Sequence, residues 1–156
     1  MSRTFDDLAA MVGESLGTSG WTEVTQEMID TFADCTGDRQ WIHVDVERAK
    51  KESPFGGPVA HGYLSLSLLA PQMMEIDITP KGTIAATNYG LNKVRFLAPV
   101  PAGAKVRTHA TLKSFEEKAP GQYLMCSEAT MEIEGGDKPA LVAETLAMLF
   151  AAPPRG

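Results

Sequence analysis

The second half of the chain alternates apolar and polar residues with the period of a β-sheet that has one wet face. In residues 122–134 one face is apolar apart from a single serine and comprises Met125, Ser127, Ala129, Met131 and Ile133. The other face carries Glu128, Thr130, Glu132 and Glu134. Residues 83–96, 104–116 and 139–151 are also rich in β-branched or aromatic residues, and Gly/Pro turns separate them. The pattern predicts four antiparallel strands, with residues 135–138 as a hairpin turn.

The first half of the chain is typical of helices. Thr25 is placed to cap a helix that runs to Gly37, a residue that can turn left-handed and end it. Residues 59–75 are apolar almost all round, as in a helix buried on most sides, and Pro71 is expected to kink or shorten that helix. Because helices precede strands, the predicted class is α+β, with an antiparallel sheet wrapped around the long helix.

Shorter segments complete the pattern. Residues 13–20 are predicted to be a Gly/Ser/Thr-rich link, and residues 21–24 a brief strand. Asp45 is placed to cap a short helix over residues 47–51, and residues 53–58 are predicted to form a loop. No internal repeat is visible.

Length and charge limit the classes of function. The 156 residues fit a single domain, 1–156, with a core over about 15–150. The net charge of -6 argues against a nucleic-acid partner. Two cysteines without CxxC spacing and an acidic N-terminus without a signal-peptide pattern favour a cytoplasmic protein, and we expect no membrane segment.

The strongest candidate for chemistry is the run GDRQWIH at residues 37–43, which places Asp38 and His43 just beyond the end of the predicted helix. A carboxylate and an imidazole together can hold and activate a water, because one accepts a proton while the other donates one. Such a pair supplies at most two metal ligands, and the chain has no HxxxH, HxH or paired-Cys spacing, so no metal site is expected.

Other polar residues have simpler interpretations. His61 either lines a ligand tunnel or, as we favour, hydrogen-bonds a nearby carbonyl and fixes the start of the long helix. His109 is interpreted as an ordinary, partly exposed strand residue. Four basic residues are expected to gather on neighbouring strands, where they either meet anionic groups of a ligand or form solvated faces: Lys93, Arg95, Lys105 and Arg107.

The chain resembles the MaoC-like, (R)-specific enoyl-CoA hydratase family of hot-dog folds, and within it the branch of nodulation protein N-like sequences. The resemblance rests on FADCTGD (32–38), the Asp38-x4-His43 spacing, PFG (54–56) before PVAHG (58–62), and YGLNKVRF (89–96) before PV (99–100). It covers roughly residues 15 to 150.

The resemblance implies a five- or six-stranded sheet around the long helix, a homodimer that pairs its sheets edge to edge, and an acyl-CoA substrate. It implies that Asp38 and His43 are the catalytic pair and that the Gly62 N–H receives the thioester oxygen. No separate cofactor is implied. Substrate contacts are expected from His61, Asn88, Tyr89, Asn92, Lys93 and Arg95.

One departure concerns Ala70, which stands where well-studied members have a serine that supports the catalytic aspartate. Ser67, Asn88 and Asn92 are the candidate substitutes.

The expected activity is reversible hydration of trans-2-enoyl-CoA to (R)-3-hydroxyacyl-CoA. The alternatives are an acyl-CoA thioesterase of the same fold and a non-catalytic acyl-thioester binding subunit.

Overall fold

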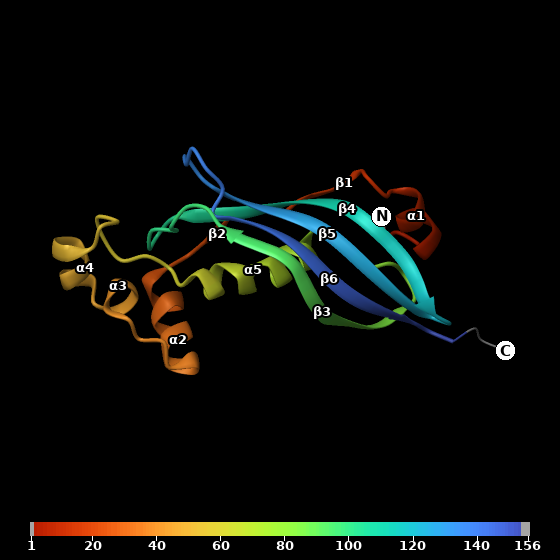
Figure 1. Cartoon of the computed structure of the whole chain (residues 1–156), viewed down its shortest axis with the longest axis horizontal. Coiled ribbons are helices and arrows are strands. Elements are labelled where there is room, and N and C mark those ends of the chain that lie inside the picture. Colours follow the sequence, from red (N-terminus) through yellow and green to blue (C-terminus); the bar gives the residue numbers. More distant parts are fainter. Residues whose placement is uncertain (1, 154–156) are drawn as a thin grey trace.

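The architecture is an antiparallel sheet of six strands whose concave side holds a long helix (Figure 1). The computed structural model describes residues 2–153. The four predicted strands are present, as β3 (Thr83–Phe96), β4 (Lys105–Ala119), β5 (Gln122–Ile133) and β6 (Leu141–Ala151). The sheet order is β1-β4-β5-β6-β3, and β2 also pairs with β4. The predicted inward face of β5 is buried, and Gly135 has the positive φ (73°) of a turn residue.

Two short strands border β4. The 13–20 stretch, predicted to be a link, contains β1 (Ser15–Thr18), so that prediction was wrong. Its glycines have low strand propensity, but the free edge of β4 offers backbone partners along its length. The predicted brief strand is confirmed as β2 (Thr22–Glu23).

The helices that precede the site begin and end where their capping residues predict. The Thr25 side chain accepts from the Met28 N–H at the start of α2 (Gln26–Thr36), and Gly37 ends that helix with φ 85°. Asp45 caps α4 (Val46–Glu52). The short α3 (Trp41–Val44), which contains His43, and α1 (Phe5–Ala10) complete the first half. In Figure 1, α3 and α4 project beyond one end of the sheet, at the opposite end of the molecule from both termini.

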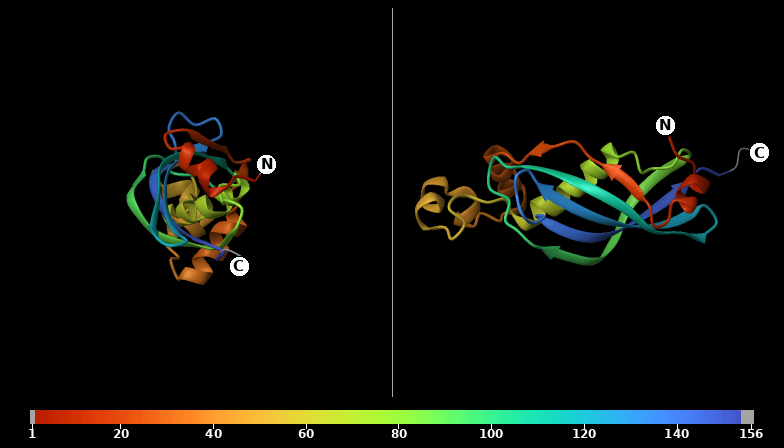
Figure 2. Two further views of the ribbon diagram at one scale, coloured as in Figure 1. Left: turned by 90° about the vertical axis from the view of Figure 1, so that its right-hand side faces the viewer. Right: turned by 90° about the horizontal axis from the view of Figure 1, so that it is seen from above.

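The long helix α5 spans Gly62–Glu75, so it begins three residues later than predicted. The reason is tertiary: Val59 pairs with Pro101, and the Ala60 N–H donates to the Val100 carbonyl (2.8 Å), which holds this segment extended. Pro71 lies inside α5 and does not shorten it. Figure 2 shows the sheet curving around α5, and the shared core contains Leu64, Leu69, Val106, Ala129, Met131 and Leu141.

One side of α5 is uncovered, contrary to the expectation of burial on most sides. Tyr63 is 71% exposed and Met74 is 75% exposed. The neighbouring strand β3 pairs with β6 alone among the described residues, and it exposes Tyr89 and Leu91. The structure therefore has an unpaired sheet edge with exposed apolar side chains beside a bare helix face. No helix within residues 2–153 is long and apolar enough to cross a membrane.

Candidate active site

Asp38 lies in a tight turn between α2 and α3, and its carboxylate is exposed. The turn follows from Gly37, whose left-handed conformation reverses the chain directly after α2. Asp38 has few local restraints: its N–H donates to Thr36 Oγ1 (3.3 Å), and its Oδ1 accepts from the Gln40 N–H (3.4 Å). Most of the carboxylate's hydrogen-bonding capacity is therefore available to a ligand.

His43 is buried and held in one tautomer. Its Nδ1 lies 2.6 Å from the Val59 carbonyl oxygen, and because a carbonyl only accepts, Nδ1 carries the proton and Nε2 presents a lone pair. Burial lowers the pKa of His43 below its ordinary value, against an opposing effect of the Val59 hydrogen bond. Gln26, which sequence reasoning missed, donates from Nε2 to the His43 carbonyl (2.8 Å) and anchors α3 to α2. His43 is thus a neutral imidazole with a free basic nitrogen.

His61 completes a three-residue cluster with Asp38 and His43. Its Nε2 lies 2.8 Å from the Asp38 carbonyl oxygen, so the predicted bond to a nearby carbonyl is confirmed. Its ring stacks on His43 with centroids 3.9 Å apart and 25° between the planes. His61 is also the residue before the first turn of α5, as expected from its predicted role at the start of the helix.

One ligand atom each from Asp38, His43 and His61 lies within 4.8 Å of the other two, so His61 adds a third candidate metal ligand to the predicted pair. The geometry nevertheless fits a metal poorly. Imidazole lone pairs lie in the ring planes, and two stacked rings direct them side by side instead of toward one ion. A gap of this size between Asp38 and His43 suits a water that makes hydrogen bonds of about 2.8 Å to both.

The start of α5 supplies backbone N–H groups beside this pair. No side chain caps the helix, and Gly62 is its first residue. Uncapped N–H groups at a helix N-terminus favour negative charge. A Cβ at Gly62 would lie 3.2 to 3.3 Å from three atoms of the Phe96 ring. The absence of a side chain at Gly62 therefore lets the Phe96 ring lie close to the start of α5.

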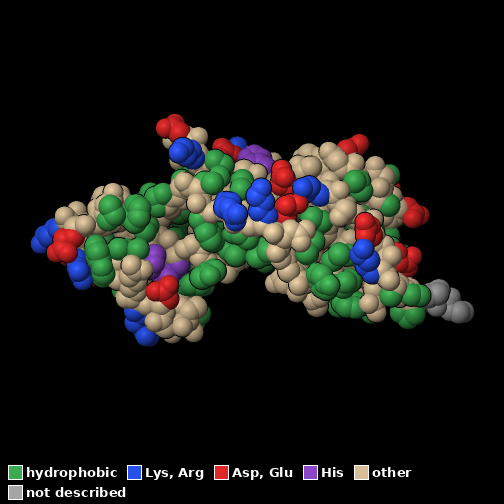
Figure 3. Space-filling view, in the orientation of Figure 1, with side chains coloured by type: hydrophobic (Ala, Val, Ile, Leu, Met, Phe, Trp, Pro, Cys, Tyr) green, Lys and Arg blue, Asp and Glu red, His purple; other side chains and the backbone are tan. Residues whose placement is uncertain are grey.

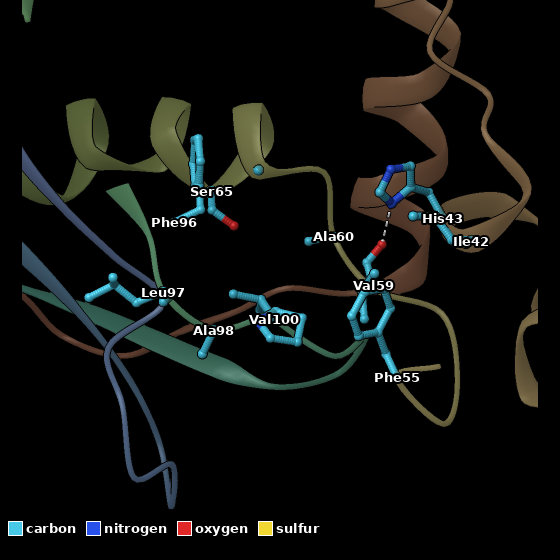
Figure 4. Close-up of a pocket in the computed structure, with 13 residues that line it drawn as sticks. Ile42, His43, Phe55, Val59, Ala60, Ser65, Phe96, Leu97, Ala98 and Val100 are labelled. Carbon is cyan, nitrogen blue, oxygen red and sulfur yellow. Dashed lines mark hydrogen bonds between the residues drawn. The ribbon is translucent and has the colours of Figure 1, made fainter. Parts of the chain in front are cut away.

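A cavity of about 280 Å³ joins His43 to the start of α5 (Figure 4). Its walls are mostly apolar and come from the 53–58 loop, the segment before α5, and the end of β3 with the turn after it. Besides His43 and Gly62, they include Phe55, Val59, Ser65, Phe96, Leu97 and Val100. Sequence reasoning missed Ser65 and the aromatic walls Phe55 and Phe96 as pocket residues. Of the Asp38/His43 pair, only His43 lines this cavity. An apolar chamber that reaches a polar side chain suits a substrate with an aliphatic part and a reactive polar group.

The predicted substrate contacts on β3 do not line this cavity. Asn88, Tyr89, Asn92, Lys93 and Arg95 are all exposed along the sheet edge. By strand alternation, Lys93 and Arg95 point away from the side on which Phe96 meets Gly62. Within one chain, the structure therefore brings together Asp38, His43, His61 and Gly62, and leaves the β3 residues apart.

The expectation that four basic residues gather on neighbouring strands was wrong. Lys93 and Arg95 lie on β3 and Lys105 and Arg107 on β4, and β5 and β6 separate these strands. Arg107 pairs with Glu132 (2.7 Å) and stacks on Trp21. In Figure 3 basic and acidic side chains intermingle over the outer face of the sheet, which is typical of a solvated surface.

The candidate substitutes for the missing serine do not reach Asp38 within the described chain. Ser67 Oγ donates to the Tyr63 carbonyl of its own helix (2.7 Å). Asn88 and Asn92 lie on the exposed edge strand, and Ala70 is exposed on α5. The one side chain beyond the local turn that hydrogen-bonds Asp38 among residues 2–153 is His61.

Comparisons with known proteins show the family of the chain. The family model described as "MaoC like domain" matches residues 7–133. The chain is 49% identical over 152 residues to 3-hydroxyacyl-thioester dehydratase Z of Mycobacterium tuberculosis, covering 96% of this chain and 99% of that protein. It is 41% identical over 147 residues to nodulation protein N of Rhizobium meliloti, covering 93% and 90%.

The structure is also similar to that of an (R)-hydratase from Pseudomonas aeruginosa. The TM-score is 0.70 at 22% identity, with 99% of this chain and 96% of that chain covered. This similarity confirms the hot-dog fold that the sequence resemblance implied.

Proposed function

The chain belongs to the MaoC-like dehydratase family and is a hydro-lyase, and from that premise we propose that it reversibly hydrates trans-2-enoyl-CoA to (R)-3-hydroxyacyl-CoA. The name of the Mycobacterium relative, a 3-hydroxyacyl-thioester dehydratase, supports a thioester substrate. The observation that carries the proposal is that the Asp38 carboxylate and a ring nitrogen of neutral His43 lie within 4.8 Å of each other, a separation that one water can bridge.

The proposed reaction adds this water across the double bond on one face. The water oxygen attacks C3 and forms the C3–O bond, the pair Asp38/His43 takes one proton from the water, and the same pair delivers one proton to C2. Two groups that share one water titrate together, so the proton transfers belong to the pair. Between the two transfers negative charge collects on the thioester oxygen, and the Gly62 N–H at the uncapped start of α5 stabilises it.

The proposed reaction uses no redox cofactor, because addition of water to a conjugated thioester involves no net oxidation or reduction. It uses no metal, because the Asp38/His43 pair is proposed to move the protons and the Gly62 N–H to stabilise the negative charge. Lys93 and Arg95 are proposed to contact the CoA phosphates, and Asn88, Tyr89 and Asn92 other parts of the substrate, from the exposed strand β3. The two free cysteines, Cys35 and Cys126, are compatible with the proposed cytoplasmic location.

One assay separates hydration from the alternatives. Purified protein is mixed with crotonyl-CoA, and the absorbance of the conjugated thioester and the release of free thiol are followed together. Loss of conjugation without thiol supports the hydratase. Thiol release identifies a thioesterase, and no change in either signal identifies a non-catalytic binder; both results contradict the proposal.

The activity is expected to persist to a lower pH than an ordinary histidine would allow. The pair needs His43 neutral, and burial lowers the His43 pKa below 6.5, so His43 stays unprotonated until the pH falls below that value. The kcat/KM of hydration should therefore stay level around neutrality and decline only below pH 6.5. A pH series of kcat/KM measures this, and an acid inflection at or above pH 6.5 would contradict the assignment of His43.

We also propose that the protein is a homodimer formed through β3. The unpaired edge of β3, the exposed Tyr89 and Leu91, and the bare α5 face at Tyr63 and Met74 form one apolar surface. Antiparallel pairing of two β3 strands satisfies the edge N–H and carbonyl groups and covers this surface.

The Leu91→Lys variant tests this arrangement, because a lysine on an edge strand opposes strand pairing and is costly to bury in an interface. Its molar mass, measured by light scattering after gel filtration, should fall from that of a dimer to that of a monomer. Val12→Lys is the matched control, since Val12 and Leu91 are both 46% exposed, and Val12 directly follows α1 and its capping residue. An unchanged mass for Leu91→Lys would contradict pairing through β3.

A further inference from the structure

His61 connects three parts of the candidate site through one buried side chain. Its Nε2–H donates to the Asp38 carbonyl (2.8 Å), its ring stacks on His43 (3.9 Å), and Gly62 follows it in the chain. Phe32 of α2 packs on the ring as well, with centroids 4.9 Å apart. His61 is 2% exposed, so its ring is shielded from solvent.

Burial of His61 carries an energetic cost at its other ring nitrogen, Nδ1. Since Nε2 donates to a carbonyl, Nδ1 of neutral His61 is an acceptor, and within residues 2–153 it has no hydrogen-bond partner. A buried polar atom without a hydrogen-bond partner is destabilising. An apolar residue would avoid that cost, so the helix start and the packing alone do not explain a histidine here. What a histidine provides at this position, and an apolar residue would not, is the hydrogen bond from Nε2–H to the Asp38 carbonyl.

The segment before α5 aligns both members of the pair. The Val59 carbonyl accepts from His43 Nδ1–H, and the Val59 N–H donates to the Ile42 carbonyl (3.1 Å). Two residues later, His61 donates to Asp38. Asp38 is otherwise held by contacts of 3.3 and 3.4 Å from its own turn. Without the His61 bond, the Asp38 backbone has no restraint from outside that turn among the described residues.

We propose that His61 is a positioning residue, which fixes the Asp38 backbone against the start of α5 and supports the His43 ring so that the two groups meet one water. This inference rests on the proposed hydration activity and deepens it. Ala70 stands where a serine was expected to support Asp38, and the inference assigns this support to His61. Since Nε2 bonds a carbonyl and Nδ1 is enclosed, His61 acts through Asp38 and His43, and the substrate contact that was also expected of it is not needed.

Two substitutions separate the hydrogen bond from the ring. His61→Phe keeps an aromatic ring between Phe32 and His43 but removes the donor to Asp38. His61→Gln loses the ring but can place an amide N–H close to the Nε2 position. Displacement of a catalytic group by about 1 Å can cost about 100-fold in rate, so His61→Phe should lower kcat by about 10- to 100-fold with KM within about threefold of wild type. His61→Gln should retain more of the activity than His61→Phe.

Rates are taken per folded protein, judged by circular dichroism below the unfolding midpoint of each variant, so that a loss of folding is not counted as a loss of kcat. His109→Phe, a histidine on the outer face of the sheet, is the control and should keep wild-type kcat. If the wild type turns over crotonyl-CoA, two results would overturn the inference and leave the proposed function standing. One is an unchanged kcat in His61→Phe, and the other is an equal loss of kcat in the two His61 variants. Absence of wild-type turnover would instead defeat the proposed function, and the inference with it.

Discussion

The Asp38→Asn variant is expected to lose about 10²- to 10⁴-fold of the hydration rate while it remains folded. The amide cannot take a proton from the bound water, so the shared proton transfer with His43 fails. The fold should tolerate the change, because the side chain is exposed and its one backbone contact, the Gln40 N–H, can still bond the amide oxygen of asparagine. Turnover of crotonyl-CoA and the thermal midpoint measure the two effects separately.

Asp34→Asn is the matched control for this variant. Asp34 is an exposed carboxylate four residues earlier on α2, and its side chain pairs with Arg39 at the surface. Removal of this charge changes the net charge by the same amount but removes no part of the proposed pair, so activity should be close to that of wild type. If Asp38→Asn keeps near wild-type turnover, Asp38 has no role in the chemistry and the hydratase assignment fails.

A loss of about 10²- to 10⁴-fold is also expected for His43→Asn, through the other half of the pair. The asparagine amide can occupy the position of Nδ1 and donate to the Val59 carbonyl, whereas nothing replaces the basic Nε2. Loss of the stack on His61 should cost about 1 kcal/mol of stability. Initial rates on crotonyl-CoA and a urea unfolding curve test both statements.

The residual activity of His43→Asn gives a second test, because the decline in kcat/KM below pH 6.5 should disappear with the imidazole. The pair is expected to act as a unit, so the Asp38→Asn/His43→Asn double variant should be only slightly slower than either single variant. Additive losses would show that the two side chains act at separate steps and would contradict a shared water.

The sequence by itself determined the local structure of this protein. The four long strands, the cap at Thr25 and the end of α2 at Gly37 follow from interactions between residues close in the chain, and all were predicted correctly. The same holds for placing Asp38 directly after α2, because Gly37 sets the turn. Strand alternation and helix capping depend on short-range backbone geometry, which a single sequence records.

Pairing between distant segments could not be predicted from these signals. The strand β1 forms in a Gly/Ser/Thr-rich stretch because β4 provides an edge. In the sheet, β5 and β6 lie between β3 and β4, an order that no local pattern records. The start of α5 moves to Gly62 because Val59 and Ala60 bond Pro101 and Val100. Each outcome depends on which backbone partner is available, and not on local preference.

The candidate site also combines features set by the local sequence with features set by tertiary contacts. The sequence determined that a carboxylate and an imidazole stand five positions apart after a helix, which is enough to nominate Asp38 and His43. Only the tertiary structure decided the state of the pair: the tautomer of His43 depends on Val59, 16 residues away, and the support of Asp38 on His61, 23 residues away. The physical reason is that burial and hydrogen-bond partners set protonation and orientation, and both arise when α5 and the segment before it pack against the α2–α3 turn.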